Sequence, residues 1–86
     1  ICPRADWAQA MDSGSYAGSA VDQADGFIHF STALQAPETA AKHFAGQHDL
    51  VLVRVDADLL PAGALKWEPS RGGALFPHLY APLPVA

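Results

Sequence analysis

An imidazole lies in the middle of a short apolar segment, "DGFIHFST", residues 25–32. If this segment is a strand, alternation places His29 on one face with Phe27 and Ser31 and turns the two intervening apolar side chains to the other. An imidazole there needs a hydrogen-bond partner. It could be structural, bonded to a backbone carbonyl or to Ser31. Alternatively it lines a cleft with Ser31 and Thr32, where small polar groups suit a ribose or phosphate oxygen.

A second histidine, His78, occurs in "FPHLY" and shares a predicted strand face with Tyr80. Its structural interpretation is a histidine of an edge strand, and its functional one places both side chains at the same cleft as His29. Glu68, in "ALKWE", is either a solvated carboxylate or one that stabilises a cationic transition state or activates a hydroxyl. The candidate catalytic residues are therefore Glu68 and His78.

The remaining reactive residue types give weaker indications. The loop "SRGG", residues 70–73, could bind an anion through Arg71 and free amides, or it is a simple turn. His43 and His48 are separated by a glycine and do not share a helix face, and no cysteine or histidine pair has zinc-ligand spacing, so no metal site is expected. Cys2 is the single cysteine and has no base beside it in the sequence.

Composition limits the classes of protein. The chain has 86 residues, half of them hydrophobic and 16% charged, which predicts one compact domain. Its net charge is −4 and its basic residues are scattered, which disfavours nucleic acid as a partner, and a small-molecule or nucleotide ligand is the expected one. No apolar stretch approaches the roughly 20 residues of a membrane span. One cysteine fits a reducing compartment, and we expect a cytoplasmic protein. The oligomeric state stays open.

Hydrophobic spacing and turn residues predict the elements that would position these side chains. They are a helix at 4–12 with Trp7, Ala8 and Met11 as its apolar stripe, a strand at 26–31, a helix from Pro37 to Gly46, and strands at 50–56, 64–68 and 74–80. Residues 13–25 are rich in Ser, Gly, Ala and Asp and predict a loop. Strand 50–56 is apolar on both parities except at Arg54, which favours a central position. Pro77 cannot donate to a ladder, which favours an edge or a bulge.

This order of elements predicts an α+β domain with helices packed on a mainly antiparallel sheet. Ser31 or Thr32 is expected to cap the turn that leads into the second helix. We also expect a short strand of the domain to precede Ile1.

Several segments in this order carry a resemblance to a known family. "ADWAQAM", "GFIHFST", "DLVLVRVDADLL" and "LKWEPSRGGALFPHLY" closely resemble the DUF952 family of uncharacterised bacterial proteins. The resemblance covers nearly the whole chain, so residues 1–86 are expected to be a single DUF952-like domain. The family name implies no activity.

A more distant resemblance does imply one. "FIHFST", followed by an alanine-containing helix and a strand that ends in "VDADLL", resembles the catalytic half of the NAD-dependent tRNA 2′-phosphotransferases. These enzymes have the ADP-ribosyltransferase-like fold, which implies a split, barrel-like antiparallel sheet with two to three helices packed on it, and NAD as the cofactor. The resemblance places His29 and Ser31 at the NAD cleft, with Thr32 as a helix cap, and makes Glu68 the candidate carboxylate by position.

Two hypotheses follow, and the sequence leaves open whether the chain is an enzyme. The first is ADP-ribosyl-transfer chemistry, with Glu68 and His78 as catalytic residues. It assigns nucleotide binding to His29, Ser31, Thr32, Arg71 and Tyr80. The alternative is a non-catalytic small-ligand or protein-binding module in which the histidines are structural. Imidazoles that share an open cleft would favour the first hypothesis, and buried imidazoles bonded to backbone would favour the second.

Overall fold

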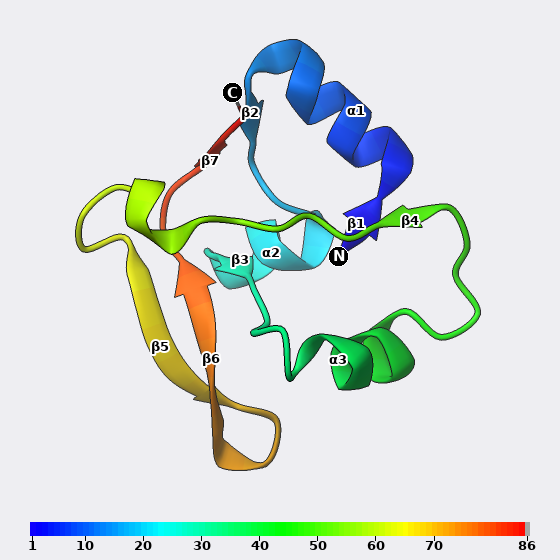
Figure 1. Ribbon diagram of the computed structural model, residues 1–86, viewed down its shortest axis with the longest axis vertical. Helices are drawn as coiled ribbons and strands as arrows, with labels where there is room; N and C mark the ends of the chain where they lie inside the picture. The colour runs from blue at the N-terminus through cyan, green and yellow to red at the C-terminus, as the bar shows by residue number, and fades with distance from the viewer. Residues whose placement is uncertain (86) are drawn as a thin grey trace.

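The computed structural model describes residues 1–85, apart from the side chain of Arg71, and has three α-helices, two short 3₁₀ turns and seven short strands in the described part (Figure 1). In chain order these are β1 Cys2–Pro3, α1 Arg4–Ser13, β2 Ser15–Tyr16, α2 Ala20–Asp25, β3 Ile28–His29, α3 Ala36–His43, β4 Leu50–Val51, η1 Ala57–Leu59, β5 Leu65–Ser70, η2 Arg71–Gly73, β6 Ala74–Leu79 and β7 Leu83–Pro84. None of the described helices has the length and apolar character to cross a membrane.

All strand pairing in the described residues is antiparallel, and it is divided among three sheets. β1 pairs with β4, β2 pairs with β7, and the third sheet has the order β3-β6-β5. The α+β class and the antiparallel pairing are therefore confirmed. The sheets of residues 1–85 do not close into the barrel-like arrangement that the distant resemblance implied. Two of the three sheets consist of paired two-residue strands, and no ladder in residues 1–85 joins one sheet to another.

The β5–β6 hairpin is the longest regular element and projects from the rest of the molecule (Figure 1). Its register runs without interruption from Leu65 opposite Leu79 to Ser70 opposite Ala74. The turn between the strands contains Gly72 and Gly73, with φ angles of 69° and 88° that side chains rarely tolerate. The predicted strands at 64–68 and 74–80 are thus confirmed, and β5 extends two residues further than predicted.

β6 is the central strand of its sheet, so the prediction that Pro77 marks an edge or a bulge is wrong. The carbonyl of Pro77 accepts a hydrogen bond of 2.9 Å from the N–H of Phe30. In an antiparallel ladder the backbone N and C=O of one residue point to the same neighbouring strand. The nitrogen of Pro77, which carries no hydrogen, therefore points toward the β3 side and not toward β5. β3 ends at His29, one residue before Phe30. The proline therefore lies where the ladder stops and interrupts no regular pair.

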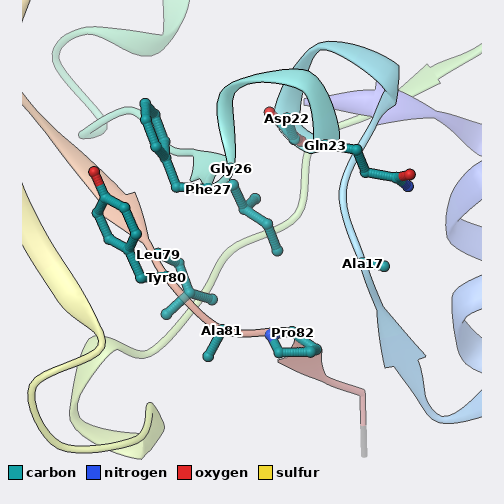
Figure 2. Close-up of a pocket in the computed structure, with 10 residues that line it drawn as sticks. Ala17, Asp22, Gln23, Gly26, Phe27, Leu79, Tyr80, Ala81 and Pro82 are labelled. Atoms are coloured by element: carbon teal, nitrogen blue, oxygen red, sulfur yellow. The ribbon is translucent and has the colours of Figure 1, made fainter.

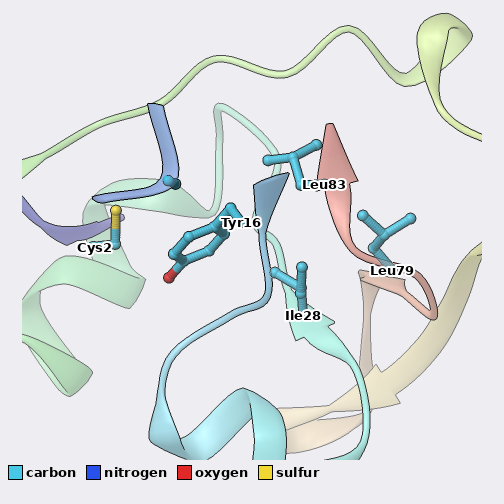
Figure 3. Packing of buried hydrophobic residues seen from close by; sticks show 6 residues of the cluster. Cys2, Tyr16, Ile28, Leu79 and Leu83 are labelled. Carbon is cyan, nitrogen blue, oxygen red and sulfur yellow. The ribbon is translucent and has the colours of Figure 1, made fainter. Parts of the chain in front are cut away.

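The core lies on one face of this sheet and continues under β1, β2 and β7 (Figure 3). Ile28 and Leu79 are cross-strand partners, both are buried, and Leu79 is 0% exposed. Strand alternation then directs the next pair, His29 and His78, to the opposite face. The predicted parity of "GFIHFST" is confirmed, although its ladder holds only Ile28–His29 rather than residues 26–31.

α1 matches the predicted helix 4–12 and ends at Gly14, which adopts the left-handed conformation at φ 87°. Its predicted stripe is correct only for Trp7, which packs against the core; Ala10 is the buried residue, whereas Ala8 and Met11 are exposed. α3 has Pro37 in its first turn, as expected, but ends at His43 rather than near Gly46.

The predicted central strand 50–56 is also wrong. Only Leu50–Val51 enter a ladder, and their partner is the two-residue β1. Val53 and Val55 pack against the core without pairing. The apolar alternation of this segment therefore reflects packing on one side, without the backbone ladder that alternation usually accompanies.

Residues 13–25, predicted as a loop, contain β2 and α2. α2 begins with a capping box in which the Ser19 hydroxyl accepts from the N–H of Asp22 and the Asp22 carboxylate accepts from the N–H of Ser19. Gly26 ends the helix in the left-handed conformation. These local signals outweigh the loop-like composition of the segment, and α2 brings two carboxylates to the face that carries the histidines.

Candidate functional site

The sheet face opposite the core carries a group of imidazole, carboxylate and phenol side chains. His29 of β3 lies directly opposite His78 of β6, with 5.4 Å between the ring centroids. Glu68 comes from β5, and Tyr80 follows the last residue of β6. The structure thus brings together four of the residues that the sequence singled out.

Glu68 is held by an imidazole and a phenol. Oε1 of Glu68 lies 2.8 Å from Nδ1 of His78 and accepts a 2.6 Å hydrogen bond from the Tyr80 hydroxyl. The hydrogen bond from Tyr80, and after it the one from His78, lowers the pKa of Glu68. The Tyr80–Glu68 bond in turn raises the pKa of the Tyr80 hydroxyl. Glu68 is thus an anion at neutral pH, and Tyr80 and His78 orient it. His78 itself is 4% exposed, whereas the Glu68 side chain keeps 36% of its surface accessible, so the carboxylate can meet a ligand from its open side.

His29 lies between two aspartates of α2. Its Nδ1 is 2.6 Å from Oδ1 of Asp22, and its Nε2 is 3.0 Å from Oδ2 of Asp25. The backbone N–H of His29 also donates to Oδ1 of Asp22 at 3.2 Å. The Asp22 side chain is 10% exposed and that of Asp25 is 50% exposed, so Asp22 is the partner that fixes the ring. The imidazole keeps 35% of its surface accessible.

The aspartates are the site residues that sequence reasoning missed. The spacing Ser19-x-x-Asp22 is a capping-box signal, and it would have predicted the helix that carries both carboxylates. Gly18 permits this arrangement, because a Cβ at that position would lie 2.6 Å from Cβ of Asp22 and the residue has a φ of +97°. No comparable local signal pairs Asp25 with His29.

Phe27 connects the two imidazole–carboxylate pairs. Its ring stacks on His78 at a centroid distance of 4.2 Å and an interplanar angle of 22°, and it also contacts His29 at 4.6 Å and Tyr80 at 5.1 Å. Lys66 places its Nζ 5.1 Å from the centroid of the Tyr80 ring. The cluster is therefore one packed unit with an aromatic centre.

A cavity of about 270 Å³ adjoins this cluster, between α2 and the segment that leaves β6. Figure 2 shows the rings of Phe27 and Tyr80 side by side at one end and Ala17 at the other, with Pro82 below. Neither His29 nor His78 lines this cavity; the cluster reaches it through Phe27 and Tyr80. A smaller cavity of about 50 Å³ lies on the core side of His29.

The other predicted binding residues lie elsewhere or outside the description. The Ser31 hydroxyl is 2.8 Å from that of Thr39 in α3. The Thr32 hydroxyl accepts from the N–H of Gln35, so Thr32 caps the turn before α3, as the sequence predicted. The side chain of Arg71 lies outside the described residues, while its backbone forms part of the hairpin turn.

Near the core, two further titratable groups are shifted by burial. Burial raises the pKa of the Cys2 thiol and that of the Tyr16 hydroxyl. Within residues 1–85, no three histidine, cysteine, aspartate or glutamate side chains are grouped so that they could hold a metal ion.

The fold and this cluster define a small α+β domain with two imidazole–carboxylate pairs on one sheet face. Residues 1–86 match the family described as "Protein of unknown function (DUF952)", and the chain belongs to that family. It is also similar to protein CC0527 from Caulobacter crescentus. In the crystal structure of CC0527 the sequence is 60% identical to this chain and the TM-score is 0.92. The match covers 98% of this chain and 73% of that one. For the solution NMR structure of CC0527 the sequence identity is 61% and the TM-score is 0.81, and the match covers 96% of this chain and 71% of that one. The comparison with curated proteins found no match.

Proposed function

We propose that this chain binds NAD or a related nucleotide beside the Phe27 and Tyr80 rings and carries out chemistry of the ADP-ribosyl-transfer type, on a fold distantly related to that of the ADP-ribosyltransferases. One observation carries the proposal. Glu68 is an oriented, ionised carboxylate whose phenol partner, Tyr80, lines a cavity. Perturbed titratable groups beside a concave site are the usual mark of a functional centre.

The proposed reaction breaks the C1′–N bond between ribose and nicotinamide. Nicotinamide leaves as a neutral molecule with the bonding electron pair, and the anomeric carbon develops oxocarbenium character. The negative charge of Glu68 stabilises this cationic centre. The oxygen of an acceptor then bonds to C1′, and its proton passes to Glu68 and on to solvent. Tyr80 and His78 hold Glu68 through Oε1, so they act as positioning residues.

The size of the cavity limits which part of the substrate it can enclose. Its 270 Å³ lies just below the roughly 300–1,000 Å³ of pockets that bury a drug-sized ligand. One ring with its sugar is therefore the part that we assign to the cavity, and the remaining nucleotide would extend over the open surface. His29 keeps 35% of its side-chain surface accessible next to this cluster, and we assign its Nε2 to a ribose hydroxyl that would take the place of the half-exposed Asp25.

A non-catalytic ligand-binding or protein-binding module is the second candidate, and a specific observation favours it. His78 is buried, both histidines bond to carboxylates, and neither lines the larger cavity. In this alternative the two imidazole–carboxylate pairs hold α2, β3, β5 and β6 together.

An NMR titration of the isotope-labelled chain with NAD, followed by an assay of nicotinamide release, separates the two candidates. We expect saturable shifts at Phe27, His29 and Tyr80, and turnover that Glu68→Gln abolishes. The matched control is Glu38→Gln, which changes an exposed glutamate that pairs with Lys42 on α3. Binding without turnover in the unmodified chain would favour the non-catalytic module. No shifts at millimolar NAD would refute the proposal.

A further inference from the structure

β5 is the outer strand of its sheet and presents an open edge. The strand order is β3-β6-β5, and Figure 1 shows β5 on the outer side of the hairpin. The carbonyl of Ala64 accepts from the N–H of Tyr80, so even-numbered residues of β5 turn their backbone groups toward β6. The N–H and C=O groups of Leu65 and Trp67 therefore face outward. The Trp67 residue beside this edge is 54% exposed.

We propose that two copies of this chain associate through antiparallel pairing of their β5 strands, centred on Trp67. In this register Trp67 exchanges two backbone hydrogen bonds with the partner's Trp67. The N–H of Leu65 donates to the carbonyl of the partner's Pro69. Pro69 has no N–H to return that bond, so the pairing is short and its affinity modest. The two three-stranded sheets become one continuous sheet.

Charge complementarity selects this occupant and this register. Lys66 and Glu68 flank Trp67 and point to the same face of the sheet. Antiparallel pairing centred on Trp67 places Lys66 opposite the partner's Glu68, and Glu68 opposite the partner's Lys66. These are non-hydrogen-bonded pairs, in which the side chains approach most closely, with Cβ atoms about 4.5–5.5 Å apart.

The neighbouring registers are unfavourable for the same reason. Backbone complementarity permits only shifts that keep outward-facing residues opposite one another. Shifting the partner strand by two residues in one direction places Lys66 opposite the partner's Lys66. The same shift in the other direction places Glu68 opposite the partner's Glu68. Like charges directly opposite destabilise a sheet pair, so the sequence Lys66-Trp67-Glu68 selects the register centred on Trp67.

The association also changes the candidate site. Glu68 belongs to the His78–Tyr80 network, and Lys66 lies against the Tyr80 ring. In the paired form each Glu68 gains the ammonium group of the partner's Lys66 on the face that carries the cluster. The second copy thus contributes a charged residue to each site, whatever ligand that site binds.

Sedimentation velocity of the full chain, from micromolar to millimolar concentration, tests the association. We expect reversible dimers in the unmodified chain and in Lys42→Glu, which makes the same charge change at an exposed lysine on α3. Lys66→Glu places a carboxylate opposite the partner's Glu68 and is expected to raise the dimer Kd at least about tenfold. Circular dichroism of each variant checks that it is folded.

A second measurement tests the register itself. In a mixture of isotope-labelled and unlabelled chains, filtered NMR spectra should show contacts between Leu65 and the partner's Pro69. A monomer at every concentration would overturn the proposal. Equal dimer affinity for Lys66→Glu and Lys42→Glu, or a dimer without the Leu65–Pro69 contact, would also overturn it.

Discussion

Replacing Asp22 with alanine should be among the most destabilising single changes outside the core. Asp22 closes the capping box of α2 with Ser19 and holds His29 through both its ring and its backbone N–H. Loss of a cap costs about 1 kcal/mol, and loss of a hydrogen bond to a charged group costs about 1.5–3 kcal/mol. We discount the second figure because the His29 ring is partly accessible. The expected loss is about 2–4 kcal/mol of the free energy of unfolding.

Urea unfolding, followed by tryptophan fluorescence, measures this loss. Trp7 reports on the core because its ring lies 5.9 Å from that of Tyr16, in an edge-on arrangement. For a domain of this size, at about 4–8 °C per kcal/mol, the loss corresponds to a decrease in melting temperature of roughly 8–32 °C. An unchanged slope of the unfolding free energy against urea concentration would show that the substitution changes stability without changing the surface exposed on unfolding.

Asp25→Ala is the matched control because Asp25 contacts the other nitrogen of the same imidazole. Its side chain is half exposed, so its ion pair should contribute less than about 1 kcal/mol. If the two variants lose equal stability, burial and capping do not distinguish the aspartates and the reasoning is wrong. A loss below about 0.5 kcal/mol for Asp22→Ala would refute it as well.

Three further outcomes follow from burial and hydrogen bonding. The chain's two tyrosines, Tyr16 and Tyr80, both have raised pKa values. Because unfolded tyrosines ionise near pH 10, the folded state holds more protons than the unfolded state above that pH. The free energy of unfolding should therefore fall as the pH rises from about 10. Tyrosinate absorbance and alkaline unfolding curves check this, and ionisation at the ordinary pKa would contradict it. Leu79→Ala should cost about 2–5 kcal/mol in urea unfolding, against less than about 1 kcal/mol for the exposed Leu75→Ala. The buried Cys2 thiol, with its raised pKa, should react with a thiol reagent only as the chain unfolds; rapid reaction of the native protein would show that Cys2 is accessible.

Strand alternation predicted the parts of the fold in which one face is buried. It assigned Ile28 to the core side and His29 to the other, and it located the β5–β6 hairpin. It failed for residues 50–56, because valines that pack on the core produce the same pattern whether or not their backbone enters a ladder. The position of β6 was unpredictable for a related reason: a proline is compatible with a central strand when the neighbouring strand ends beside it.

The site was predicted in part because its members share one strand parity. Glu68, His78 and Tyr80 lie on adjacent strands in register, so side-chain alternation places them on a common face. Ser31 and Thr32 share a segment with His29 but follow the end of β3, and their hydroxyls bond to Thr39 and Gln35. Alternation gives no information beyond the last ladder residue.

The two histidines illustrate how different surroundings assign different tasks to the same residue type. His78 is withdrawn from water and bonds to a carboxylate that Tyr80 also holds, so it orients Glu68 and has little access to a ligand. His29 is fixed by the buried Asp22, keeps 35% of its side-chain surface accessible, and pairs its other nitrogen with the half-exposed Asp25. Phe27 packs against both rings, so one aromatic side chain connects the two imidazole–carboxylate pairs. The surface beside Phe27 and Tyr80 is therefore shaped by both imidazole–carboxylate pairs, and this is the surface that the proposed nucleotide would contact.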